Sequence, residues 1–287
     1  MRPSNLRTRV FLDGGNPDES TEIVKVLGFL DGQTTNPTLI AKNPKAKERL
    51  SAGKRFTEKE VLEFYRNVVQ TISSLIPRGS VSVEVYADAG TSAERMLDQA
   101  SEMSTWIPNV HIKFPTSTQG LKAAGEAVKR GLRVNMTLCF SQAQAAAVYA
   151  ATAGAKRGDV FVSPFVGRLD DRGENGMDLI AHILTMYKGG DGHVEVLTAS
   201  VRTLDHFLYA LMLGTDIVTA PFGILKDWAG QGLPVPGDGY RYDAKNLKPV
   251  IYEDTPLTRA WHEYDISHPL TDKGMELFSK DWNALIG

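Results

Sequence analysis

Residues 110–139, VHIKFPTSTQGLKAAGEAVKRGLRVNMTLC, contain the pattern that decides the fold. Two runs rich in apolar and β-branched residues, 110–115 and 132–140, each have the composition of a strand. Between them, residues 117–131 carry apolar side chains three and four positions apart and end on a glycine, which indicates a helix. Because a helix joins the two strands, the strands are predicted to run parallel.

The same strand and helix unit recurs along the whole chain. Strand-like runs begin near residues 10, 31, 81, 110, 132, 160, 194 and 216, and helical patterns such as 92–106 and 202–214 lie between them. Eight such units in 287 residues predict an α/β protein with a (β/α)8 TIM barrel fold. A doubly wound open sheet is the alternative, but it needs no eighth unit, and the sequence contains neither GxGxxG nor GxxxxGK[ST].

The predicted organisation is a single barrel domain over residues 1–287, in which residues 230–287 form a C-terminal extension. The long interval after the second strand holds residues 37–56, a basic and partly helical excursion, and then a helix from about 57 to 76. Residues 230–256 are rich in Gly, Pro and Asp and are predicted to be irregular. The sequence does not indicate what residues 37–56 and 230–256 do.

The end of the chain is predicted to be a helix with one apolar stripe. Met275, Phe278, Trp282 and Leu285 fall on the same face at helical spacing. This stripe packs either on its own barrel or on a neighbouring subunit, and the pattern leaves both open. Assembly into a homo-oligomer is expected.

Charge and composition exclude several classes of partner. Lys and Arg number 32 against 34 Asp and Glu, so the net charge of −2 provides no basic surplus for nucleic acid or anionic lipid. The single cysteine, Cys139, excludes an internal disulfide, and the first residues lack the apolar core of a secretory signal, so a reducing, cytoplasmic location is expected. The apolar stretches are all shorter than the ~18 residues of a membrane span.

The alternation of side chains along the strands predicts a polar barrel interior. Alternate residues of a barrel strand face the helices or the interior. Because valines occupy one face of residues 81–85, Glu84 is predicted to point inward, and the same argument places Lys113 inside on the next strand. Other residues predicted to point inward are Asp13, Ser82, Tyr86, His111, Arg133, Asn135, Thr137, Cys139, Phe161, Ser163 and Phe165.

Polar residues at these positions favour a functional site. Barrel interiors are normally filled by Val, Ile and Leu, and burying Asp13, Glu84 and Lys113 costs desolvation energy that packing does not require. The alternative is a structural ion pair between Lys113 and Glu84. No HxH or HExxH pattern occurs among the six histidines, so no metal site is expected.

A lysine inside a walled barrel suits Schiff-base chemistry. An ordinary ammonium with a pKa of ~10.4 provides less than about one part in a thousand of free amine at pH 7, and desolvation increases that fraction. Ionised Glu84 and Asp13 would oppose this effect if they were close to the amine. We therefore expect water or distance to separate both carboxylates from Lys113.

Five segments together resemble the transaldolase family. They are DGQTTNPTLIAK from Asp31, IKFPTS around Lys113, VNMTLCFS from Val134, VSPFVGR from Val162 and ASVRT from Ala199. The closing HPLTDKGMELFSKDW is also similar to the C-terminal helix of shorter members. The resemblance implies a (β/α)8 barrel that transfers a dihydroxyacetone unit from a ketose phosphate to an aldehyde acceptor, with sugar phosphates as substrates and no cofactor.

The resemblance also implies roles for individual residues. Lys113 would form the Schiff base, Glu84 would move protons through a water held by Thr137, and Asp13 would take the proton of the sugar hydroxyl as the C–C bond breaks. The residues that would hold the hydroxyls of the three-carbon unit are Asn36, Asn135 and Ser163.

Three further residues match the phosphate-binding positions of the family: Arg168, Ser200 and Arg202. Two guanidiniums and a hydroxyl suit a tetrahedral dianion. The alternative is that the arginines form salt bridges at the rim with Asp170, Asp171 and Asp205. A sulfonate has a similar shape, so a transaldolase acting on a sulfonated sugar is a further possibility.

Two residues bear on the choice between transferase and aldolase. The related fructose 6-phosphate aldolases carry an amide where this chain has Glu84 and a tyrosine where it has Phe165, so both residues favour a transaldolase. Alternatives are an aldolase that releases free dihydroxyacetone, and a barrel that binds a sugar phosphate without catalysis. Residues 37–56 and 230–256 depart from the compact family pattern.

Overall fold

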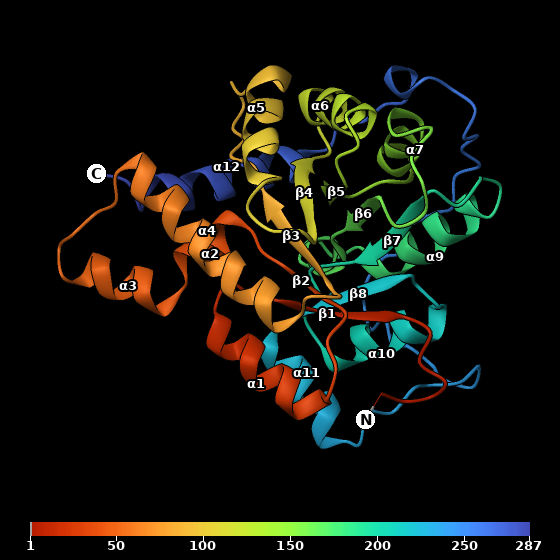
Figure 1. The fold of residues 1–287 in the computed structure, drawn as a ribbon. Coiled ribbons are helices and arrows are strands. Elements are labelled where there is room, and N and C mark those ends of the chain that lie inside the picture. The colour runs from red at the N-terminus through yellow and green to blue at the C-terminus, as the bar shows by residue number, and fades with distance from the viewer. Residues whose placement is uncertain (1) are drawn as a thin grey trace.

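Eight parallel strands close into a barrel within residues 2–287, which the computed structural model describes (Figure 1). The strands follow one another around the barrel in chain order, and Val10 pairs with Val218 where β1 meets β8. This closure confirms the (β/α)8 prediction over the open sheet. The strands are β1 (Arg9–Asp13), β2 (Gly32–Thr34), β3 (Ser80–Glu84), β4 (Val110–Pro115), β5 (Val134–Cys139), β6 (Val160–Pro164), β7 (Val194–Thr198) and β8 (Ile217–Ala220).

Helices surround the strands on the outside (Figure 1). They are α1 (Pro17–Leu27), α2 (Pro37–Ala41), α3 (Pro44–Ser51), α4 (Glu58–Leu75), α5 (Ala93–Met103), α6 (Thr118–Lys129), α7 (Gln142–Ala151), α8 (Val166–Asp170), α9 (Gly176–Tyr187), α10 (Leu204–Leu213), α11 (Phe222–Gly230), the 3-10 helix η1 (Trp261–Glu263) and α12 (Pro269–Asn283). The excursion at 37–56 is partly helical, as predicted, and contains α2 and α3.

Local sequence explains where the helices begin and end. At the start of α4, Thr57 and Glu60 form a reciprocal capping box, in which each side chain accepts a hydrogen bond from the other residue's backbone N–H. At the end of α10, Gly214 adopts φ 71°, the left-handed conformation that favours glycine. The strand predicted to end at Asn36 is shorter than expected, because Asn36 instead caps α2 by accepting a hydrogen bond from Leu39 N.

The C-terminal extension runs along the outside of the barrel before it returns to the carboxyl ends of the strands. Residues 231–260 form no regular helix or strand, which agrees with the irregular structure predicted for 230–256 except at Gly230, the last residue of α11. They contact α10, where the Tyr242 ring stacks on Tyr209 at 4.7 Å, and then α7, where Glu253 N donates to Gln142 Oε1 at 2.8 Å. The extension therefore spans several helices of the outer layer.

The final helix packs on its own barrel. Phe278, Trp282 and Leu285 are buried, and the Trp282 ring lies 5.9 Å from that of Tyr65 on α4. The backbone of Phe56 pairs with that of Ile286, so the C-terminus lies near the start of α4 (Figure 1). The first of the two predicted packings is confirmed, and assembly into a homo-oligomer stays a prediction.

Strand alternation predicts most of the interior correctly but is wrong near the strand ends. The β5 strand has an irregularity between Met136 and Cys139, and Leu138 adopts φ 59°. The alternation therefore shifts: Leu138 points toward α12, next to Gly274, and the Cys139 thiol lies 3.7 Å from Ser141 O. The prediction that Cys139 points inward is wrong because a regular strand was assumed.

Two more residues that were predicted to point into the barrel do not, because they lie outside the strands. Tyr86 follows the end of β3, and its hydroxyl contacts Asp88 and Asn283, near the end of α12. Arg133 precedes β5 and donates to Pro108 O at 2.7 Å, partly exposed at the amino end of the barrel. The alternation rule holds only while a residue is in the sheet.

Aromatic and polar side chains close the amino end of the barrel. His111 stacks on Phe161 at 4.0 Å and makes hydrogen bonds with Ser80 Oγ and Gly158 O. Burial lowers the pKa of His111 to about 3, so the ring is neutral near pH 7. These side chains fill the amino end of the barrel, and a large cavity lies at the carboxyl ends of the strands.

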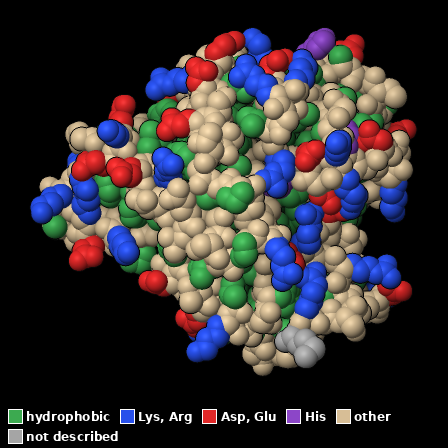
Figure 2. All heavy atoms as spheres, viewed as in Figure 1, with side chains coloured by type: hydrophobic (Ala, Val, Ile, Leu, Met, Phe, Trp, Pro, Cys, Tyr) green, Lys and Arg blue, Asp and Glu red, His purple; other side chains and the backbone are tan. Residues whose placement is uncertain are grey.

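The molecular surface carries charges of both signs. Figure 2 shows Lys and Arg side chains mixed with Asp and Glu side chains over one face, in keeping with the net charge of −2. Within residues 2–287, every helix is too short or too polar to cross a membrane.

Candidate active site

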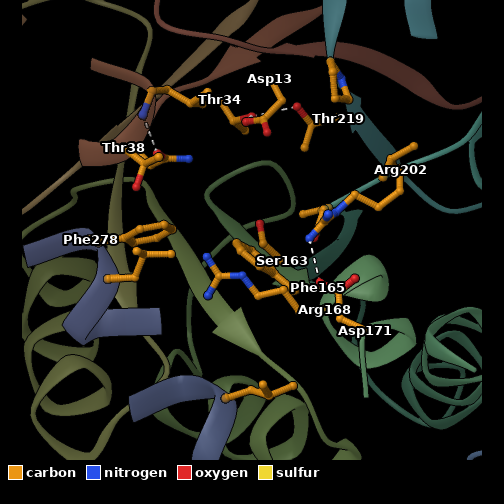
Figure 3. A pocket seen from close by; sticks show the side chains of 18 of the residues that line it. Asp13, Thr34, Thr38, Ser163, Phe165, Arg168, Asp171, Arg202, Thr219 and Phe278 are labelled. Carbon is orange, nitrogen blue, oxygen red and sulfur yellow. Dashed lines mark hydrogen bonds and ion pairs between the residues drawn. The ribbon is translucent and has the colours of Figure 1, made fainter. Parts of the chain in front are cut away.

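A cavity of about 550 Å³ lies at the carboxyl ends of the strands. Its position is the usual one for active sites in this fold. Figure 3 shows side chains from the strands, α8 and α12 pointing into it. Of the residues that the sequence nominates, those that line the cavity are Asp13, Asn36, Lys113, Ser163, Phe165, Arg168, Ser200 and Arg202, and those that lie behind its wall are Glu84, Asn135 and Thr137.

Lys113 places a buried amine at the cavity wall. The residue is 3% exposed, and its Nζ donates to Thr35 O at 3.0 Å. Nζ also forms an ion pair with Glu84 Oε2 at 2.8 Å. The expectation that water or distance separates Glu84 from the amine is wrong, because the β3 and β4 register places the two residues directly opposite each other.

The ion pair does not remove the cost of burying Glu84. Burial raises the pKa of the Glu84 carboxyl above its ordinary value, while the charges of Lys113 and Arg168 oppose that change. A carboxyl with a raised pKa that contacts an amine is suited to accept its proton and return it. The pair therefore combines the predicted structural alternative with a geometry suited to proton transfer.

Asp13 ends β1 at the cavity floor and forms no ion pair in the described part of the chain. Thr34 Oγ1 donates to Asp13 Oδ1 at 2.7 Å and lies 2.6 Å from Thr219 Oγ1 (Figure 3). Burial raises the pKa of Asp13, although the Thr34 hydrogen bond and the charge of Lys113 oppose the change. The site thus holds two carboxyl groups in different surroundings: Glu84 is paired with the amine, and Asp13 accepts a hydrogen bond from a threonine hydroxyl.

Three of the small polar residues that the sequence nominates, Asn135, Thr137 and Ser163, lie on β5 and β6. Ser163 Oγ donates to Asn135 Oδ1 at 2.7 Å, and Asn135 Nδ2 donates to Ser82 Oγ at 3.0 Å. Thr137 Oγ1 is buried and has no hydrogen-bond partner among residues 2–287. A buried hydroxyl of this kind is an exception that calls for an explanation, such as a bound water.

Two arginines reach the mouth of the cavity with different partners. The Arg168 guanidinium makes no hydrogen bond or ion pair within residues 2–287, and its carbon lies 5.2 Å from the ring centres of both Phe165 and Phe278. Arg202 donates to Asp171 Oδ2 at 3.0 Å, and both side chains are more than half exposed. The predicted rim salt bridge is therefore present for Arg202, whereas Arg168 keeps its donors available.

Several residues that line the site escaped the sequence reasoning. Thr34 donates to Asp13, and Thr219 contacts the Thr34 hydroxyl. The alternation of β2 and β8 could have indicated both threonines. Phe278, Lys42 and Lys273 also line the cavity. No local sequence pattern indicates that these three residues line a cavity. Phe278 and Lys273 reach the site only because α12 folds back over the barrel.

Comparison with known proteins decides the affiliation. The family described as "Transaldolase/Fructose-6-phosphate aldolase" matches residues 10–287. The chain belongs to this family. The match includes residues 37–56, residues 230–256 and the barrel from the second residue of β1 onward.

Individual relatives are similar over the same length. A protein of Dehalococcoides mccartyi named "Probable transaldolase" is 35% identical over 277 residues, which cover 96% of this chain and 99% of that protein. A protein of Brucella ovis with the same name is 36% identical over 274 residues, which cover 96% of each chain. The similarity therefore extends over the C-terminal extension as well as the barrel.

Proposed function

We propose that this protein is a transaldolase that transfers a dihydroxyacetone unit from a ketose phosphate to an aldehyde acceptor through an imine on Lys113. The observation that carries the proposal is the buried Lys113 amine, 2.8 Å from Glu84 at the wall of a cavity that Asp13 also lines. Family membership and the names of the relatives support it. Mere binding of a sugar phosphate would not require an amine beside two acids.

Imine formation begins with a proton transfer within the ion pair. The ammonium of Lys113 gives a proton to Glu84, and the free amine attacks the C2 carbonyl of the ketose to form a carbinolamine. Protons delivered from Glu84 then convert the C2 hydroxyl to water, which leaves as the C=N bond forms. The Thr137 hydroxyl, which has no hydrogen-bond partner in the described part of the chain, supports a water through which these protons move.

Cleavage uses the second carboxylate. Asp13 takes the proton of the C4 hydroxyl, the C4–O bond becomes a carbonyl, and the C3–C4 bond breaks. The bonding electrons move into an enamine over C3, C2 and Nζ, because the protonated imine accepts them. The aldehyde leaves, and an acceptor aldehyde then reacts with C3 by the reverse steps before water releases the new ketose from Lys113.

Binding and orientation belong to the remaining residues. We assign the terminal phosphate to Arg168, Arg202 and Ser200, since the Arg168 guanidinium has donors that no residue in 2–287 engages. The hydroxyls of the three-carbon unit belong to Asn36, Asn135 and Ser163. Lys42 and Lys273 add positive charge at the same mouth, which favours an anionic substrate.

Borohydride trapping tests the proposal directly. Reduction in the presence of fructose 6-phosphate should give a stable adduct that maps to the peptide containing Lys113, and Lys113→Ala should abolish it. Lys122→Ala is the matched control, because Lys122 lies on the exposed surface of α6. A wild-type protein that stays unlabelled contradicts the transaldolase and the aldolase readings together.

The balance between transferase and aldolase needs a separate measurement. Phe165 has no hydroxyl to protonate a carbanion, which supports transfer to an acceptor over release of free dihydroxyacetone. Turnover of fructose 6-phosphate with and without an acceptor aldehyde decides between them.

Two further measurements test the substrate and the assembly. Comparison of phosphorylated and sulfonated donors decides which anionic group the site binds. Light scattering after gel filtration tests the expected homo-oligomer.

A further inference from the structure

A buried histidine contacts both the helix that carries Arg168, α8, and the loop that carries Arg202. His206 lies in the first turn of α10, and only 4% of it is exposed. Neither the cavity lining nor the proposed reaction includes this residue. Its ring is surrounded by three polar partners, each from a different segment of the chain.

The first partner is the backbone of Arg202. The N–H of Arg202 donates to His206 Nδ1 at 3.3 Å. This bond requires a lone pair on Nδ1, so the proton of the neutral ring is on Nε2. Thr203 caps the same helix by accepting from His206 N, so residues 202–206 form a closed turn.

The second and third partners lie at Nε2. Tyr242 Oη, from residues 231–260, lies 3.0 Å from Nε2 and can accept its proton, and Asp170 Oδ2 lies 2.8 Å from the same atom. Asp170 is the last residue of α8, the short helix that carries Arg168, and its other oxygen accepts from Gly176 N at 2.9 Å. His206 therefore contacts α8 at one edge of its ring and the Arg202 backbone at the other.

We infer that His206 is a positioning residue that keeps Arg202 at a fixed position relative to Arg168, so that both arginines bind the substrate phosphate. The inference rests on the proposed function, which assigns the phosphate to these arginines. Gly167 N, which donates to Ser200 O at 3.0 Å, is a second link between the two elements. Loss of His206 should therefore loosen the Arg202 loop without detaching it.

The contact with Tyr242 gives the C-terminal extension a place in this arrangement. The Tyr242 ring stacks on Tyr209, and Tyr240 donates to Asp205 in the first turn of α10. Residues 231–260 thus contact the outer side of α10 at its start, and this start directly follows the Arg202 loop in the chain.

The test compares half-saturating concentrations for imine trapping with fructose 6-phosphate and with fructose, which lacks the phosphate. His206→Ala should raise the value for fructose 6-phosphate about two- to tenfold, as expected for one lost hydrogen bond, and leave that for fructose unchanged. His206→Asn should recover part of the loss, because its Oδ1 can accept from Arg202 N. His262→Ala is the control, since that histidine is exposed.

The outcomes separate this inference from the proposed function. The inference is overturned if His206→Ala shifts the half-saturating concentrations of both donors equally, or if it leaves the value for fructose 6-phosphate unchanged. It is also overturned if a folded His206→Asn binds fructose 6-phosphate as weakly as His206→Ala does. If His206→Ala does not fold, His206→Asn should bind fructose 6-phosphate more tightly than His206→Gln, because the longer Gln side chain carries its amide oxygen past the position of Nδ1. Equal affinities or the reverse order overturn the inference. Arg202→Ala is the reference: if it leaves the phosphorylated donor unaffected, the phosphate assignment itself fails, and an untrapped wild type contradicts the transaldolase.

Discussion

Lys113 Nζ lies 2.8 Å from Glu84 Oε2, and each side chain is only 4% exposed. Buried ion pairs add little to stability, because desolvation offsets the attraction, but removal of one partner leaves an uncompensated charge. A barrel that needed only a packed interior would place apolar residues here. The pair is therefore better explained by chemistry than by stability.

Glu84→Gln tests that explanation. The amide keeps the shape of the side chain but cannot accept the proton of Lys113, so imine formation should slow about a hundredfold or more. Rapid-quench trapping with borohydride measures this rate. Glu94→Gln, which changes an exposed carboxylate, is the control. A wild-type trapping rate in Glu84→Gln would show that Glu84 does not move protons in this step.

Asp13→Asn should separate imine formation from cleavage. Asn can still accept the Thr34 hydrogen bond, but it cannot take the proton of the C4 hydroxyl. The variant should trap the intact hexose phosphate on Lys113, and release of the aldehyde should fall about a hundredfold or more. Mass analysis of the adduct distinguishes six carbons from three, with Asp18→Asn on the surface as the control. A three-carbon adduct formed at the normal rate contradicts the role of Asp13.

The difference in stability between Asp13→Asn and the wild type should depend on pH. Burial raises the pKa of Asp13 above its ordinary 3.8, so the folded protein retains this proton to a higher pH than the unfolded chain does. As pH rises from about 4 through the raised pKa, the Asp13 contribution to the free energy of unfolding is lost. Asn does not ionise, so Asp13→Asn should become more stable than the wild type over this interval and keep the advantage at higher pH. Urea unfolding at several pH values measures the difference, and a constant difference would contradict the raised pKa.

Arg168→Ala should affect only phosphorylated donors. Hydrogen bonds to charged groups contribute about 1.5–3 kcal/mol, so KM for fructose 6-phosphate should rise roughly tenfold or more. KM for fructose should stay unchanged. Arg130→Ala, at the exposed end of α6, controls for a general loss of positive charge. Equal losses with both donors would contradict the phosphate assignment.

Gly274→Ala should weaken phosphate binding although it improves helix propensity. A Cβ at this position of α12 would lie 2.6 Å from Leu138 Cδ2 and 2.7 Å from an Arg168 Nη atom, so both side chains must move. Ala favours a helix by about 1 kcal/mol over Gly, which offsets part of the strain. We expect thermal stability close to that of the wild type and a higher KM for fructose 6-phosphate. An unchanged KM would show that Arg168 has room to adapt.

The sequence determined the barrel and most of its interior. Strand alternation is a local property of the backbone, so the inward positions of Glu84, Lys113 and Asn135 follow from neighbouring residues alone. The order of the strand and helix units determined the topology for the same reason. The wrong positions, Tyr86, Arg133 and Cys139, lie where a strand ends or has an irregularity, and composition does not reveal those boundaries.

Only the tertiary structure decided how these residues meet. The register between β3 and β4 brings Glu84 into direct contact with Lys113, where the sequence suggested separation. The return of α12 over the barrel places Phe278 beside Arg168, and the turn at α10 links His206 to Arg202 and Asp170. These contacts join residues between four and more than a hundred positions apart, and they depend on packing and register among whole elements, which periodicity within one segment does not specify.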